Sequence, residues 1–189
     1  MNTVAHMVIA SAVMARPDRP KQNWAILAGS FLPDASMFVF FAWSRLQGWS
    51  GEETWNVRYW TEPWQTLGAI SNSLVLFGLF LAIAWWRKWP LLMALSTAAL
   101  IHIGLDLPLH ADDAHRHFWP ISDWRFISPV SYWDPDQMGW LGGLIESLAA
   151  LAAITVLWRR FPRKQWRIAF FVLGVVQGLV LAAQIAWWL

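Results

Sequence analysis

The sequence predicts an all-α protein, a polytopic membrane bundle of five to six hydrophobic helices with a long external loop, in a single domain over residues 1–189. The chain is 57% hydrophobic and only 14% charged, whereas an ordinary soluble domain is about a quarter charged. Many of its 17 Trp stand at the ends of apolar runs, where amphipathic rings settle at a membrane–water interface. A chain of 189 residues has room for about five or six spans of ~20 residues each.

Six apolar runs give the expected elements in chain order. The first, Thr3–Ala15, is shorter than a full span and is expected to enter the membrane only part way. It does not have the form of a signal peptide, because no Lys or Arg precedes it. The five longer runs are expected to be membrane-spanning helices; they are Trp24–Trp43, Gln65–Trp86, Pro90–His110, Gly139–Trp158 and Trp166–Leu189.

The charged connections between these runs predict the orientation. Ten of the 14 Lys and Arg lie in three connections, namely residues 16–21, 87–88 and 159–167. The other four share the stretches 45–63 and 111–138 with most of the acidic residues. The positive-inside rule places the ten in the cytoplasm, so residues 111–138 become an external, lid-like loop. The excess of Lys and Arg over acidic residues is thus explained by membrane topology. We therefore expect the lipid bilayer as partner and no nucleic acid.

Ionisable residues inside the apolar runs mark the candidate site, because such groups are costly in a membrane and are retained mainly for function. They are His6, Asp34, His102, Asp106, His110 and Glu146, with Asn72 as a polar addition. In the predicted orientation all of them lie in the outer half of the bilayer. His102, Asp106 and His110 are spaced i, i+4, i+8, which predicts that they stack on one helix face. Two ligands one turn apart are a common metal-binding arrangement.

The segment that follows adds further potential ligands. Five imidazoles or carboxylates fall within eight residues, at His110, Asp112, Asp113, His115 and His117. Imidazole and carboxylate ligands without Cys suit zinc, with manganese or iron as the alternatives. We therefore expect a divalent metal as cofactor. The aromatic stretches Phe118–Pro120 and Ser131–Pro135 are expected to form a lid on the headgroup layer.

Each candidate residue can also be interpreted as serving only the structure of the protein and not a metal site. His6 would then only form a hydrogen bond with a neighbouring helix, and Asp34 would cap a helix that restarts after Pro33. Glu146 would face the outer water, and the loop cluster would be a solvated polar face.

The order of these motifs resembles a bacterial inner-membrane family known as metal-dependent hydrolases, over about two-thirds of the chain. The matching features are His6 in a short first helix, Leu32-Pro33-Asp34, Ser71-Asn72-Ser73, and His102 with Asp106 ahead of Trp119-Pro120 and Asp123–Phe126. The resemblance implies metal ligands at His6, Asp34, His102 and Asp106. The chain departs from the family at Asn72, where the family usually has His, and at Ser36, where it often has a second Asp. The loop histidines are candidates to replace these ligands.

A closer subgroup shares the run Asp112–Phe118 and the stretch Ser128–Pro135, and some of its members carry the name of a cobalamin-biosynthesis enzyme, cobyric acid synthase. The residues do not support that activity. Such amide transfer uses a Cys nucleophile, and this chain contains neither a Cys nor a Gly-rich phosphate loop ending in Gly-Lys-Ser/Thr.

The leading hypothesis is a membrane-embedded, metal-dependent hydrolase of the bacterial inner membrane, acting at the outer face on a phosphoester or lipid-linked substrate. Its metal would be held by His102, Asp106 and one or two of the remaining ligands, which are His6, Asp34, His110, His115 and His117. Asp112, Asp113 or Glu146 would accept a proton, and Arg116 would pair with an anionic substrate.

The alternatives are an ion or metal transporter or ion-binding membrane protein, which would use Asp34, His102, Asp106 and Glu146 as a relay, and a catalytically inactive scaffold. A transport pathway needs polar groups in both halves of the bilayer, and no inverted repeat is visible.

Overall fold

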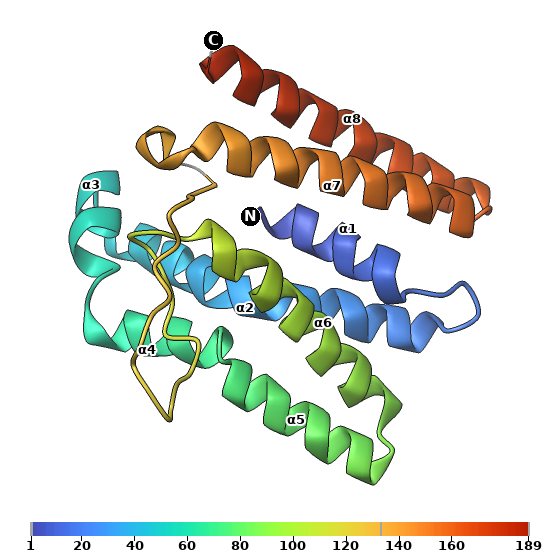
Figure 1. Cartoon of the computed structure of the whole chain (residues 1–189), viewed down its shortest axis with the longest axis horizontal. Helices are drawn as coiled ribbons and strands as arrows, with labels where there is room; N and C mark the ends of the chain where they lie inside the picture. Colours follow the sequence, from blue (N-terminus) through green and yellow to red (C-terminus); the bar gives the residue numbers. More distant parts are fainter. Residues whose placement is uncertain (1, 133, 189) are drawn as a thin grey trace.

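A computed structural model describes residues 2–132 and 134–188, and within them it is helical without any strand (Figure 1). Trp133 of the expected lid and Leu189 lie outside the described residues, as do the side chains of Trp187 and Trp188. The α-helices are α1 (Thr3–Met14), α2 (Pro20–Gln47), α3 (Gly51–Glu53), α4 (Glu62–Ser71), α5 (Leu74–Arg87), α6 (Pro90–Asp106), α7 (Gly139–Arg160) and α8 (Lys164–Trp188).

The predicted multi-pass helical architecture is confirmed. Five segments are long and apolar enough to cross a membrane, namely Pro20–Gln47, Glu62–Arg87, Pro90–Leu109, Gly139–Arg160 and Lys164–Ala186. Exposed Trp side chains stand near both ends of these segments, among them Trp24, Trp43, Trp85, Trp86 and Trp140. This is the distribution of aromatic belts at the two membrane–water interfaces.

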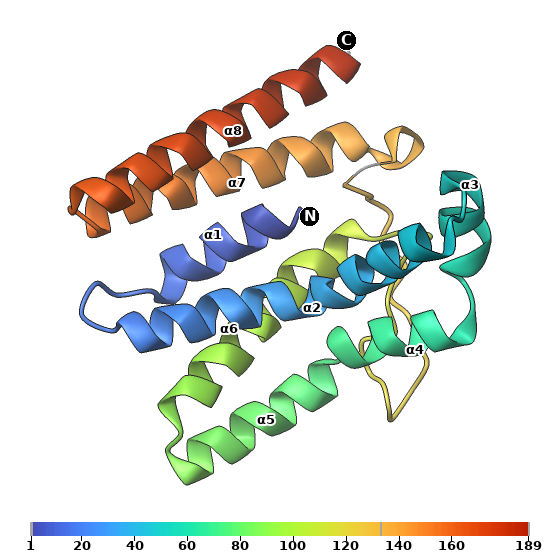
Figure 2. The same cartoon turned by 180° about the vertical axis from the view of Figure 1, so that it is seen from behind.

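The two ends of the bundle, which Figures 1 and 2 show, differ in the charge of their connecting segments. The short connections α1–α2, α5–α6 and α7–α8 all lie at one end, together with the ten Lys and Arg of residues 16–21, 87–88 and 159–167. Residues 48–61 and 110–138 lie at the opposite end. We call these the basic end and the loop end. The short helix α1 lies inside the bundle against α2, α6 and α7, whereas α8 packs mainly on α7.

Helix α2 passes through Pro33 without a break, which makes the expected helix restart at Asp34 wrong. An internal proline removes one backbone hydrogen bond and crowds the preceding turn. Packing of α2 against α1, α4 and α6 keeps it helical on both sides of Pro33. Asp34 is therefore an interior helix residue, and its side chain is not used as a cap.

Two helices end earlier than the sequence predicts. The expected span Gln65–Trp86 is divided at residues 72–73, where the Ser73 hydroxyl accepts a hydrogen bond from the Leu76 amide (3.0 Å) and begins α5. The backbone of the long loop pairs with this break, since the Leu74 amide donates to the His117 carbonyl at 2.9 Å. Helix α6 ends at Asp106 and continues as a 3-10 turn over Leu107–Leu109.

Candidate metal centre

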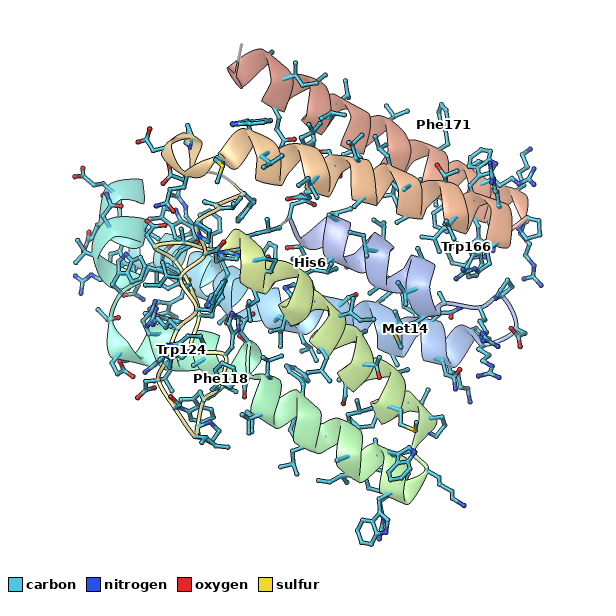
Figure 3. All side chains as sticks on the ribbon, viewed as in Figure 1. His6, Met14, Phe118, Trp124, Trp166 and Phe171 are labelled. Atoms are coloured by element: carbon cyan, nitrogen blue, oxygen red, sulfur yellow. The ribbon has the colours of Figure 1, made fainter. Side chains whose placement is uncertain are left out.

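Three buried side chains from two helices meet inside the bundle near the loop end. His6 comes from α1, and His102 and Asp106 come from α6. One ligand atom of each lies within 4.8 Å of the other two. The imidazole rings of His6 and His102 stack with centroids 3.5 Å apart, and His6 Nε2 lies 3.2 Å from Asp106 Oδ1. Figure 3 shows His6 on the face of α1 that is turned toward α6.

The backbone of α2 fixes the orientation of His102. Its Nδ1 lies 2.7 Å from the Ser30 carbonyl oxygen, so Nδ1 carries the proton and donates it. Nε2 is buried and makes no hydrogen bond of ordinary geometry among the described residues. It faces Asp34 Oδ1 at 3.5 Å. A proton on Nε2 or a cation between the two atoms would satisfy both groups, so the donor set is one that could hold a metal.

Asp34 joins the group from α2 and is held by α1. Its Oδ2 accepts a hydrogen bond of 2.5 Å from the Thr3 hydroxyl, which leaves Oδ1 directed at His102. The close approach of α2 and α6 depends on Gly29, because a Cβ there would lie 2.1 Å from the Leu95 carbonyl oxygen. Gly29 directly precedes Ser30, so this backbone contact brings the Ser30 carbonyl within reach of His102.

A second set of polar side chains continues from the first through Asp106. While Asp106 Oδ1 faces His6, Asp106 Oδ2 lies 2.8 Å from His110 Nε2. The other ring nitrogen of His110, Nδ1, lies 2.8 Å from Asp113 Oδ2. His110 thus contacts Asp106 four residues before it, as the spacing predicts, but it does so from extended backbone beyond the 3-10 turn and not from the face of α6 that carries His102 and Asp106.

The side chains of Asp34, Asp106, His110 and Asp113 reach a partly enclosed cavity of ≈ 60 Å³. It is lined by Pro33, Asp34, Ser36, Met37 and Phe40 of α2, by Trp64, Gly68 and Asn72 of α4 and its end, and by Tyr59, Asp106, His110, Asp113, His115 and Tyr132. A water molecule needs about 10–15 Å³ of such space. The cavity therefore has space for a few waters, or for the reacting group of a larger molecule.

Charge in the loop part of the site is unevenly distributed. Burial lowers the pKa of His110, but the Asp106 and Asp113 carboxylates oppose this and raise it to about 9. Burial lowers the pKa of His115 to about 3, with a further contribution from the nearby His110. Burial also raises the pKa of Tyr59 to about 12 and that of Tyr132 further. At neutral pH the cavity thus holds a neutral His115 and two un-ionised phenols.

Two loop residues of the expected cluster lie away from the cavity. His117 is buried beside the α4–α5 break, where its Nδ1 lies 3.1 Å from the Asn72 carbonyl oxygen. Asp112 is exposed and does not line the cavity. The Asn72 side chain donates to the carbonyls of Pro33 (3.0 Å) and Gly68 (3.1 Å) and so braces the same break.

Glu146 and Arg116 hold elements in place around the site. Glu146 is buried in α7, and its Oε1 accepts hydrogen bonds from the backbone amide of Asn2 (3.0 Å) and from the Asn2 side chain. Arg116 Nη1 lies 3.0 Å from Glu62 Oε1 and 3.2 Å from Asp123 Oδ1, which ties the loop to α4. Phe118 of the expected lid is exposed in the loop beside α4, as is Trp124 of the same loop (Figure 3).

Sequence reasoning missed several residues that shape the site. The Ser30 carbonyl, the Thr3 hydroxyl and the phenols of Tyr59 and Tyr132 were not among the candidates. Asn2 was also missed, although it stands just before an apolar run and its side chain caps α1 by accepting from the Ala5 amide at 2.9 Å. Asn is a preferred N-cap residue, so its position was the one signal available.

The comparisons with known proteins add no further constraint. No protein-family model, no curated protein and no solved structure matches this chain.

Proposed function

We propose that the chain is a metal-dependent hydrolase of the bacterial inner membrane, whose site faces the outside and acts on a phosphoester or lipid-linked substrate. The observation that carries the proposal is the buried group of His6, His102 and Asp106, with ligand atoms within 4.8 Å of one another inside an apolar bundle. Ionisable side chains in such surroundings are expensive to maintain and are retained mainly for function.

The chemistry of the donors supports a divalent metal. His6, His102, Asp34 and Asp106 would hold the ion through imidazole nitrogens and carboxylate oxygens. This set suits zinc, manganese or iron. A metal bound there would lower the pKa of a coordinated water toward neutrality. The departure at Asn72 removes no member of this set, because its side chain is engaged with the backbone of α2 and α4.

Asp113 is the best placed of the three expected proton acceptors. It lines the cavity, whereas Asp112 is exposed and Glu146 binds Asn2. The carboxylate of Asp113 would accept a proton from an attacking water. His110, 2.8 Å away, orients this carboxylate and balances its charge. The phenols of Tyr59 and Tyr132 would donate hydrogen bonds to a substrate oxygen in the cavity.

Arg116 takes a different role in this proposal from the one that the sequence predicts. Its guanidinium already contacts Glu62, Asp123 and Thr66, and it does not line the cavity. We therefore assign it to anchoring the loop. The size of the cavity supports a substrate that inserts only its reacting group, as a lipid-linked phosphoester held at the membrane surface would do.

The proposal is tested by metal analysis of the purified protein. Wild type should carry about one or two divalent ions per chain, and His102→Ala should lose most of this metal because the mutation removes a ligand. His117→Ala is the matched control: it removes an imidazole of the same loop end that lies outside the cavity, and should retain metal. Equal metal content in wild type and His102→Ala would refute the site.

Turnover distinguishes the hydrolase from the transporter. Phosphoesters and phospholipids presented to reconstituted protein should be hydrolysed in a reaction that a chelator stops and added zinc or manganese restores. Ion gradients across the same vesicles should remain intact. Dissipation of a gradient that disappears in Asp106→Asn would favour the transporter instead.

A further inference from the structure

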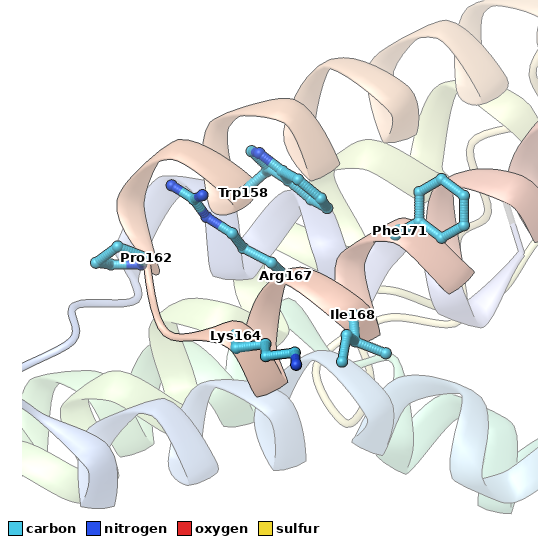
Figure 4. Close-up of a pocket in the computed structure, with 6 residues that line it drawn as sticks. All are labelled: Trp158, Pro162, Lys164, Arg167, Ile168 and Phe171. Carbon is cyan, nitrogen blue, oxygen red and sulfur yellow. The ribbon is translucent and has the colours of Figure 1, made fainter.

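A groove lies at the basic end of the bundle, beside the turn between α7 and α8 (Figure 4). It has a volume of ≈ 320 Å³ and is lined by Trp158, Pro162, Lys164, Arg167, Ile168 and Phe171. It is separate from the candidate metal centre, which lies toward the loop end. Nothing in the proposed hydrolase chemistry uses it.

The groove carries positive charge that the protein itself does not neutralise. Residues 147–189 contain five Lys and Arg and no Asp or Glu. Within the described part of the chain, neither Lys164 nor Arg167 takes part in an ion pair. The Arg167 guanidinium lies 5.7 Å from the centre of the Trp158 ring, a cation–π contact that positions the charge without cancelling it. An anion that enters the groove therefore meets two available cations.

The same groove is apolar along its other side. Ile168 and Phe171 are 55% and 62% exposed, and Phe171 lies about 10 Å farther along α8 than Lys164 at 1.5 Å per residue. Because α8 belongs to an apolar segment that is long enough to cross a membrane and begins at Lys164, we expect these two side chains to face hydrocarbon and Lys164 to lie at the surface. The groove thus suits a ligand that is anionic at one end and aliphatic at the other.

We propose that this groove is a binding site for an anionic phospholipid of the leaflet at the basic end. The phosphate pairs with Lys164 and Arg167 once their long side chains turn toward it, and an acyl chain lies along Ile168 and Phe171. Basic pockets between transmembrane helices commonly bind lipid headgroups in this way. The site does not depend on the hydrolase activity. Because it lies at the end of the weakly packed helix α8, a bound lipid would contact both α7 and α8 and hold them together.

The test compares lipids that differ only in headgroup charge. Full-length protein in nanodiscs of mixed phosphatidylglycerol and phosphatidylcholine is released for native mass spectrometry, and the retained lipid is counted. Wild type should retain phosphatidylglycerol preferentially. The double variant Lys164→Gln/Arg167→Gln should lose affinity for it by about 25-fold, which is ~2 kcal/mol for two cations at the membrane surface.

Two control variants separate the groove from general charge. Arg19→Gln/Lys21→Gln removes two cations from the same end of the bundle but outside the groove, and should retain the lipid. Lys164→Arg/Arg167→Lys keeps both charges and should bind as wild type does, which also checks that the turn still folds when both residues change.

Several results would overturn the proposal. These are equal retention of phosphatidylcholine by wild type, unchanged retention by Lys164→Gln/Arg167→Gln, or equal losses in the two charge-removing variants. Displacement of the lipid by millimolar inorganic phosphate alone would assign the cations to a soluble anion instead of a phospholipid.

Discussion

The backbone contact between α2 and α6 at Gly29 sets the geometry of the candidate metal centre, and Gly29→Ala tests this dependence. A Cβ at residue 29 would lie 2.1 Å from the carbonyl oxygen of Leu95 and 2.8 Å from its carbonyl carbon. Both are main-chain atoms, so no side-chain rotation relieves the clash. Reaching an ordinary contact of 3.4 Å from 2.1 Å requires the helices to separate locally by about 1.3 Å.

This separation acts on the hydrogen bond that orients His102. The distance from His102 Nδ1 to the Ser30 carbonyl oxygen is 2.7 Å; a shift of that size along the bond stretches it to ~4 Å, beyond hydrogen-bonding range. Loss of such a partner typically lowers metal affinity 10- to 100-fold, that is by roughly 1–3 kcal/mol. Overpacking itself costs about 1–3 kcal/mol, offset in part by ~1 kcal/mol for replacing Gly with Ala in a helix.

The assay is a zinc titration of metal-free protein in detergent, with thermal unfolding measured before and after loading. Gly104→Ala is the matched control, because it lies in α6 between His102 and Asp106 and a Cβ there meets nothing within 4 Å. Gly104→Ala should bind zinc as wild type does and unfold at the same temperature or higher. Wild-type zinc affinity in Gly29→Ala, or an equal loss in both variants, would refute the reasoning.

Three further predictions concern the surroundings of the site. Reporter fusions within residues 111–138 should report the outside and fusions near Arg163 the inside, because the positive-inside rule would place the ten clustered cations in the cytoplasm; the reverse pattern would invert the proposed orientation. Glu146→Leu should destabilise the protein by about 1–3 kcal/mol in thermal unfolding, since it removes the acceptor of two hydrogen bonds donated by the half-buried Asn2, while Glu146→Gln should lose less; equal effects of the two would contradict this. Arg116→Gln should speed limited proteolysis of the loop and leave metal content unchanged, whereas lost turnover without faster cleavage would support substrate binding by Arg116.

The spans were predictable from the sequence because the thickness of the bilayer sets the length of an apolar run. The positions at which these helices are interrupted were not predictable from the sequence. The break at residues 72–73 depends on the Leu74 amide pairing with the His117 carbonyl, 43 positions along the chain, and local patterns carry no sign of such a partner. At Pro33 the reverse holds, since a strong local signal for a break is overridden by packing against neighbouring helices.

In the site, too, the features set by neighbouring residues were predictable, and those set by contacts between distant segments were not. His102 and Asp106 were found from their spacing, because both lie on one regular helix. Only buried charge and the family resemblance pointed to His6 and Asp34, whose proximity depends on the packing of α1 against α2 and α6. The Ser30 carbonyl was not predictable, since every residue offers a backbone acceptor and none is distinguished in the sequence.

The extent of polarity within the bundle bears on whether anything crosses it. Toward the basic end, residues 82–86, 91–95 and 151–157 contain no ionisable side chain, and their buried members are Ala84, Ala94, Ala153, Ile154 and Leu157. A charge moving through that layer would lose its hydration without gaining a partner, at a cost of several kcal/mol. The cavity lining ends well before it, at Pro33 and Asp34 of α2 and at Asp106 of α6. A polar site at one end of the bundle, separated from the other end by an apolar layer, suits a reaction on a molecule that arrives and leaves by the same side, and this favours hydrolysis over transport.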